Sequence, residues 1–192
     1  MQNKNNKQKG YTIIETMIAV SLFLVIIMTG MGALLNANLL HQKSRDMRSI
    51  MDNLSFVMED MSRNLRTGYD YHCIDGTPNG SVTGTNTHSC ESGGGISFKS
   101  ALDSSQWVYA IFEDGTIQKS TLGGTSGTFR ILTPNEVVVD PVSGFSVLGA
   151  EPPPGDSQQP FVTIKLVGKI ISKNIETPFS LQTSVSQRLV DI

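Results

Sequence analysis

The chain lacks most of the features by which enzymes and nucleic-acid-binding proteins are identified. It has no Gly-x-Ser-x-Gly or His-Glu-x-x-His motif, and its glycine clusters lack the Lys-Ser/Thr that follows a phosphate-binding loop. Its three histidines, His41, His72 and His88, show no spacing that defines a Ser-His-Asp site. Basic residues are scattered, without interleaved aromatic residues. We therefore expect no enzymatic activity, no cofactor and no nucleic-acid partner.

Charge is also absent from a long segment near the N-terminus, because residues 17–35 contain no charged side chain. At ~1.5 Å per residue, a helix of this length nearly spans a hydrocarbon core of ~30 Å. An ordinary secretory signal has a shorter apolar region followed by a small-x-small cleavage site. We therefore predict a membrane-spanning helix. The basic leader before it (Lys4, Lys7, Lys9) places the N-terminus in the cytoplasm and the residues after 35 outside.

Proline is absent before Pro78, so a helix can continue well beyond the apolar run. We predict one helix over residues 12–66, with Gly68 as a left-handed cap after its end. Its second half carries an apolar seam, Met47, Ile50, Leu54, Val57, Met61 and Leu65, at spacings of three and four. The charged residues between the seam positions should stay solvated, Asp52, Glu59, Asp60 and Arg63 among them. The seam packs either on the following domain or, alternatively, in a coiled coil with another protein.

From residue 69 the sequence consists of short alternating segments separated by Gly-rich turns. We predict strands at 106–112, 129–132, 137–140, 145–148, 161–171 and 179–186, with a hairpin turn at 113–116. The last two strands alternate apolar and polar residues, as half-buried antiparallel strands do. The apolar face of these strands and the apolar seam of the helix must both be removed from water, and each can cover the other. The sequence therefore predicts an α+β fold in which an antiparallel β-sheet packs on the C-terminal half of a long helix.

Cysteine is scarce, since Cys73 and Cys90 are the only two, and both lie in the part predicted to be exported. An even count and an oxidising compartment favour a disulfide between them. Closing a loop of this size contributes ~3 kcal/mol in the chain-entropy model. His72 and His88 stand close to the two cysteines, so a zinc site of two Cys and two His is an alternative, and free thiols are another.

Two pairs of acidic residues are candidates for contact with a calcium ion, Glu113 with Asp114 and Glu136 with Asp140. Such residues more often belong to turns or to the surface, so we predict no metal here. The Pro-rich segment 151–156 is interpreted as a stiff, solvated connector between strands.

The start of the apolar run combines a basic leader, a glycine and a carboxylate. Residues 9–15 read Lys-Gly-Tyr-Thr-Ile-Ile-Glu. A carboxylate one turn inside a membrane-length helix is costly unless something specific uses it. Gly10 gives a protease an unhindered backbone. The stretch resembles the class III signal of type IV prepilins and type II secretion pseudopilins, whose pattern is Gly, an aromatic residue, Thr, an aliphatic pair and Glu. Tyr11 stands where Phe is commoner.

The resemblance implies roles for three residues of this junction. A prepilin peptidase would cleave between Gly10 and Tyr11 and methylate the new α-amine of Tyr11. Glu15 would pair with the α-amine of a neighbouring subunit during assembly, since opposite charges removed from water are tolerated when they are paired. The alternative for Glu15 is a carboxylate that snorkels at the membrane boundary. Without the leader, twelve basic residues stand against seventeen acidic ones, a net charge of −5.

The predicted layout, and the ending at 179–188, also resemble minor pilins and pseudopilins. This implies a minor subunit of a type IV filament system, either a pilus or a type II secretion pseudopilus. Residues 1–10 would be a removed leader, 11–67 the membrane and filament helix, and 68–192 an exported β-rich domain. The implied partners are prepilin peptidase, other pilin or pseudopilin subunits, an inner-membrane assembly platform and, before assembly, membrane lipid. The alternative function is a signal-anchored extracytoplasmic adhesin or binding module.

Overall fold

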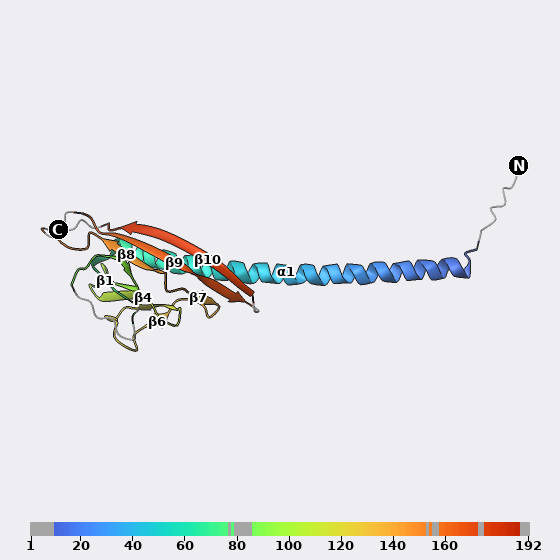
Figure 1. Ribbon diagram of the computed structural model, residues 1–192, viewed down its shortest axis with the longest axis horizontal. Helices are drawn as coiled ribbons and strands as arrows, with labels where there is room; N and C mark the ends of the chain where they lie inside the picture. Colours follow the sequence, from blue (N-terminus) through green and yellow to red (C-terminus); the bar gives the residue numbers. More distant parts are fainter. Residues whose placement is uncertain are drawn as a thin grey trace. The chain divides into compact units, whose positions relative to one another are not determined.

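The computed structural model describes residues 10–76, 78, 86–152, 154, 158–172 and 175–188. The chain divides into two compact units, Met1–Asp46 and Met47–Ile192. The one helix of the described residues, α1 (Ile13–Thr67), is followed by ten strands (Figure 1). The predicted helix over 12–66 and the predicted α+β fold are confirmed.

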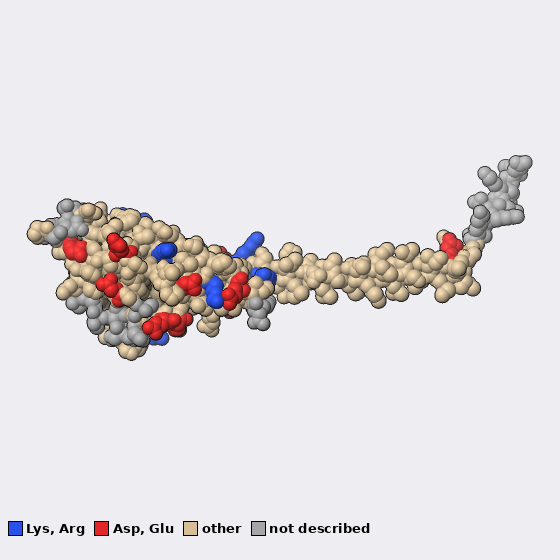
Figure 2. All heavy atoms as spheres, viewed as in Figure 1, with Lys and Arg blue, Asp and Glu red and all other residues tan. Residues whose placement is uncertain are grey.

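The part of α1 that lies in the first unit exposes its apolar side chains. Its large hydrophobic residues are mostly half or more exposed, for example Ile14 at 68% and Phe23 at 60%. No charged residue stands between Glu15 and Lys43, and Figure 2 shows this stretch almost without red or blue spheres. By length and composition, α1 can cross a membrane. These side chains therefore need lipid or other helices to cover them.

In the second unit, α1 buries one face and exposes the other. Ile50, Leu54, Val57, Met61 and Leu65 form the buried face, and Met47 packs against them. Their spacing of three and four confirms the predicted seam and its packing on the following domain. Phe56, on the opposite face, is 69% exposed.

The strands form two antiparallel sheets, where the sequence predicted one. Sheet A has the order β1-β3-β4-β5-β6, and sheet B has the order β10-β9-β8-β2, with β7 also paired to β9. The bounds are β1 Tyr69–Ile74, β2 Cys90–Gly93, β3 Gly95–Lys99, β4 Gln106–Ile111, β5 Ile117–Ser120, β6 Arg130–Ile131, β7 Val137–Val139, β8 Gly144–Leu148, β9 Phe161–Ser172 and β10 Ile175–Ser186. The single predicted sheet is wrong because strand pairing is set by contacts between residues far apart in the sequence.

Strands β9 and β10 pair along all twelve residues of each and lie beside the second half of α1 (Figure 1). Alternate residues of β9, such as Val162, Ile164 and Leu166, are buried, whereas Lys165 between them is exposed. The predicted alternation is thus confirmed for this strand. Residues from both sheets and from α1 form one hydrophobic core.

Strands β1, β2 and β3 were not predicted. In β3, Gly95, Ile96, Ser97 and Phe98 are all buried, so this strand shows no alternation of apolar and polar residues. The run Gly93-Gly94-Gly95 at its start is more typical of a turn.

The end of α1 differs from the predicted left-handed cap, because Gly68 has no positive φ. Glycine is required here for space, since a Cβ would overlap the side chain of Phe98. The Gly68 amide donates to the carbonyl of Asn64 at 3.0 Å. The Tyr71 hydroxyl lies within hydrogen-bond distance of the carbonyl oxygens of Leu65 and Gly68. These contacts satisfy backbone groups that a helix end leaves unpaired.

The predicted hairpin turn between β4 and β5 is confirmed. The Phe112 amide donates to the Thr116 carbonyl at 3.0 Å, and Gly115 has a φ of 76°. Asp114 accepts hydrogen bonds from the Thr116 amide and hydroxyl at 2.9 and 2.7 Å. This carboxylate therefore has a turn-forming role.

Candidate functional site

The junction between the leader and α1 is exposed, non-helical backbone at Gly10 and Tyr11. A Cβ added at Gly10 would meet no atom within 4 Å, and Tyr11 is 81% exposed. The helix begins two residues later, at Ile13. A protease could therefore reach the peptide bond between Gly10 and Tyr11 without first unwinding the helix. The leader lysines, Lys4, Lys7 and Lys9, lie outside the described residues.

Thr12 caps the start of α1. The Glu15 amide donates to Thr12 Oγ1 at 3.4 Å, and the Thr16 amide donates to the Thr12 carbonyl at 3.2 Å. Thr12 and Glu15 have the spacing of a capping box, a signal that the sequence analysis missed. Glu15 lies in the first turn, where the partial positive charge of the helix end favours a carboxylate. The geometry thus holds a carboxylate within one turn of the residue that would carry the new α-amine.

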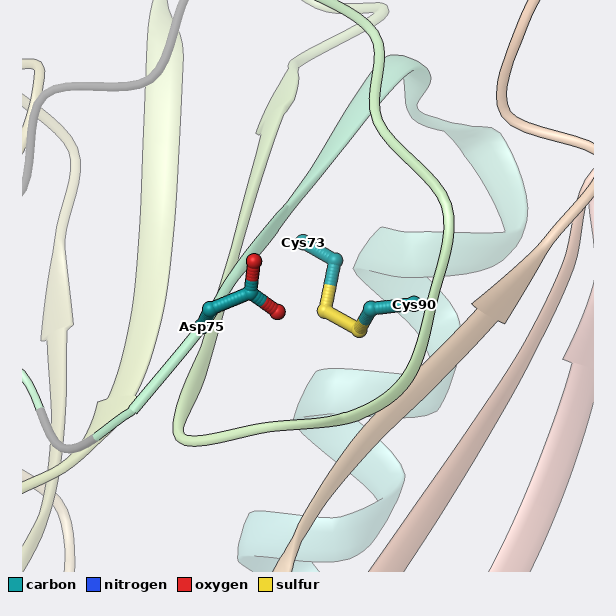
Figure 3. Close-up of side chains that lie close together, drawn as sticks. All are labelled: Cys73, Asp75 and Cys90. Carbon is teal, nitrogen blue, oxygen red and sulfur yellow. A yellow bond between two sulfur atoms is a disulfide. The ribbon is translucent and has the colours of Figure 1, made fainter.

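Cys73 on β1 and Cys90 on β2 are joined by a disulfide (Figure 3). Asp75 lies beside it, and one ligand-capable atom from each of these three residues lies within 4.8 Å of the others. Both sulfurs are bonded to each other, so neither can supply a thiolate to a metal. The zinc and free-thiol alternatives are therefore wrong for this structure. His88 Nε2 lies 3.4 Å from Asp75 Oδ2.

The disulfide segment is also held through Glu151. This carboxylate accepts hydrogen bonds from the Ser89 amide at 2.9 Å and from the Ser89 hydroxyl at 2.5 Å. These hydrogen bonds hold the pKa of Glu151 below its usual range. Glu151, the first residue of the predicted connector 151–156, therefore anchors this connector to the disulfide region. Pro153 and residues 155–156 of the connector lie outside the described residues.

Three carboxylates line a cavity of about 480 Å³, those of Glu113, Asp114 and Asp140. Glu113 and Asp114 form one of the two candidate pairs that the sequence analysis set aside, and Asp140 belongs to the other, whereas Glu136 does not line the cavity. Among the described residues, the group at Cys73 is the only set of three or more ligand atoms that lie close together. The carboxylates around the cavity do not converge in that way.

Asp60 joins α1 to sheet A, although the sequence analysis placed it among the solvated charges. Its carboxylate accepts hydrogen bonds from the Tyr109 hydroxyl at 2.7 Å and from Asn64 Nδ2 and Lys119 Nζ at 3.0 Å. The side chains of Asp60 and Lys119 are only 20% and 17% exposed. Lys119 Nζ also lies 4.4 Å from the centre of the Trp107 ring. The network links residues 60, 64, 107, 109 and 119 and fixes how the second half of α1 sits on the sheet.

The network shifts the pKa values of two of its members. Burial alone would raise the pKa of Asp60, but the hydrogen bonds from Tyr109, Lys119 and Asn64 and the charge of Lys119 together lower it. Burial, followed by the hydrogen bond to Asp60 and its charge, raises the pKa of Tyr109. Tyr109 therefore stays neutral and acts as a hydrogen-bond donor at ordinary pH.

Comparison with known proteins identifies the N-terminal segment. The prokaryotic N-terminal methylation motif matches residues 5–31, a range that contains Gly10, Tyr11, Glu15 and much of the apolar helix. No curated protein and no solved structure matches the chain. The match supports a type IV prepilin-like signal in this segment. The chain therefore carries a type IV prepilin-like signal at the start of a helix that is long and apolar enough to cross a membrane, and this helix belongs to an α+β, pilin-like fold.

Proposed function

We propose that this chain is a minor pilin or pseudopilin subunit of a type IV filament system, either a pilus or a type II secretion pseudopilus. The match of the methylation motif to residues 5–31 carries this proposal. The exposed, non-helical backbone at Gly10 and Tyr11 supports it, since a peptidase needs access to the bond that it cleaves. In this proposal Gly10 and Tyr11 form the bond that the peptidase cleaves, and Glu15 acts in assembly. The chain itself performs no catalysis.

In this proposal the chain enters the inner membrane with its N-terminus in the cytoplasm. Prepilin peptidase removes residues 1–10 and methylates the amine of Tyr11. An assembly platform then moves the subunit from lipid into a filament, where helices of like subunits cover the apolar part of α1. The exposed side chains of this part support the last step, because burying them in lipid or among helices is favourable. The β-rich domain, residues 68–192, faces outward.

Glu15 pairs with the new α-amine of a neighbouring subunit. A lone carboxylate in an apolar helix bundle is costly, and an ammonium group at the same depth offsets that cost. The position of Glu15 in the first helical turn supports this role, because the partner's amine also lies at the start of its helix. The Thr12 cap holds the first turn of α1 in helical form near the charged groups.

Two substitutions at the junction test the proposal in cells that contain the peptidase. Gly10→Val adds a branched side chain beside the cleaved bond, so the unprocessed chain should accumulate. Gly30→Ala is the matched control, because Gly30 is also exposed and a Cβ there meets nothing within 4 Å. Processing of Gly10→Val at the normal rate would contradict the proposed cleavage site.

Glu15→Ala tests assembly separately from processing. The chain should still be cleaved, yet its recovery in sheared filaments should fall strongly; Glu15→Gln, which keeps the shape and removes the charge, should behave in the same way. Glu113→Ala removes an exposed carboxylate of the β4–β5 turn and serves as the control. If Gly10→Val and Glu15→Ala both leave maturation and incorporation intact, the signal-anchored binding module becomes the better account.

A further inference from the structure

The exposed face of α1 in the second unit carries an ordered row of side chains, which we call the outer stripe. Its members are separated by three or four residues, so they share one helical face opposite the buried seam. The outer stripe consists of Arg48, Asp52, Phe56, Glu59 and Arg63, all exposed. The order is therefore basic, acidic, aromatic, acidic, basic.

These side chains have little to contact within their own chain. None of the four charged members forms an ion pair with another described residue, in contrast to Asp60, which is paired with Lys119 on the neighbouring face. Phe56 at the centre of the stripe is 69% exposed, an unusual position for a phenylalanine on a polar helix face. Exposed aromatic and arginine side chains are enriched in protein interfaces.

We propose that the outer stripe binds the outer stripe of a second copy of this chain, with the two helices parallel and shifted by eleven residues. Arg48 and Glu59 are eleven residues apart, and so are Asp52 and Arg63. Eleven residues are close to three helical turns, about 16 Å, so the same face meets the same face after the shift. Arg48 then lies opposite Glu59 of the partner subunit, and Asp52 lies opposite Arg63 of the partner subunit. The parallel orientation rests on the proposed function, in which all subunits enter the membrane in the same direction.

Other arrangements of two such stripes bring unfavourable groups together. An antiparallel pair centred on Phe56, or a parallel pair without a shift, places like charges opposite each other. A parallel shift of four residues forms two ion pairs but places Asp52 of one chain opposite Phe56 of the other, where the negative face of the ring meets a carboxylate. The shift of eleven residues avoids this contact and is the one that we assign.

A photo-crosslinking experiment on the full chain in its own membrane tests the register. Phe56 is replaced by benzoylphenylalanine, the cells are irradiated, and mass spectrometry locates the attachment point on the partner. The proposal expects attachment about eleven residues away, near residue 45 or near residue 67. Attachment near residue 56 of a second copy, attachment only to other proteins, or no cross-link at all would overturn it.

Charge reversal, read by the yield of the same cross-link, tests the pairing. Arg48→Glu alone and Glu59→Arg alone each place like charges opposite each other, so each should lower the yield roughly three- to tenfold, the scale of an exposed ion pair replaced by repulsion. The double variant Arg48→Glu/Glu59→Arg restores opposite charges and should restore the yield. Lys165→Glu on β9, an exposed reversal outside the stripe, is the control.

A double variant that stays as low as the single variants would overturn the pairing. The N-terminal mass of every variant is measured in parallel. Normal processing without the cross-link would reject this inference alone, whereas an unprocessed wild-type chain would reject the proposed function.

Discussion

Replacing Asp60 with alanine should destabilise the second unit by about 2–3 kcal/mol. The largest part comes from Tyr109, a residue with 0% exposure whose hydroxyl loses its acceptor; a buried donor without a partner costs about 1–3 kcal/mol. Lys119 loses its ion partner but keeps its contact with Trp107 and some exposure to water, which limits that loss to about 0.5–1 kcal/mol. For a unit of this size the melting temperature should fall by about 4–12 °C.

The fluorescence of Trp107 measures this effect, because it is the only tryptophan and lies in the network. The full chain in detergent, with its disulfide intact, is unfolded in urea, and Glu59→Ala serves as the neighbouring exposed control. Glu59→Ala should stay within about 0.5 kcal/mol of the wild type. An Asp60→Ala variant as stable as the wild type, or a control equally destabilised, would refute the reasoning.

The same variant has a pH signature. The pKa of Asp60 is lowered in the folded state. The ionised Asp60 side chain therefore stabilises the fold at pH values above the pKa of an unperturbed Asp, about 3.9. This stabilisation is lost as the pH falls through the lower pKa of the folded state. Asp60→Ala should therefore lose less stability than the wild type as the pH falls below about 4. A parallel loss in both proteins would show that other groups dominate acid unfolding.

Three further predictions concern the same unit. Replacing both Cys73 and Cys90 with alanine opens a loop with a sequence separation of 17 and should cost about 3 kcal/mol in urea unfolding, whereas an unchanged midpoint would show that the loop is held by other contacts. Leu54→Ala removes a fully buried side chain and should cost about 2–5 kcal/mol, while Phe56→Ala on the outer face should cost under about 0.5 kcal/mol; equal effects would contradict the assigned helix face. Gly68→Ala should lower the melting temperature because its Cβ overlaps an aromatic ring, and a gain in stability would disprove that overlap.

The elements that the sequence predicted correctly are those with a strong local signal. The buried seam from Ile50 to Leu65 follows the helical period, and β9 follows the period of two. The β4–β5 hairpin was predicted from Asp114 and Gly115, which have the turn chemistry that such a hairpin needs. The prepilin-like signal was predicted from the resemblance of residues 9–15 to the prepilin family, and the methylation motif matches residues 5–31; cleavage after Gly10 stays a prediction.

The features that the sequence analysis missed depend on residues far apart in the chain. Asp60 has the sequence context of a solvated helix charge, and only the packing of β4 and β5 brings Tyr109 and Lys119 to it. The buried strand β3 has no alternation, so its apolar residues carried no strand signal. The division into two sheets likewise arises from pairings such as β2 with β8, which local patterns do not encode.

The most direct test of the account is the intact mass of the native protein extracted from the membrane, with fragmentation of its N-terminus. If the protein is processed as a prepilin, the chain begins at Tyr11, carries one added methyl group on its α-amine and contains no Lys4, Lys7 or Lys9. A chain that still carries these residues, from cells that contain an active prepilin peptidase, would contradict the central claim that this protein is processed as a prepilin.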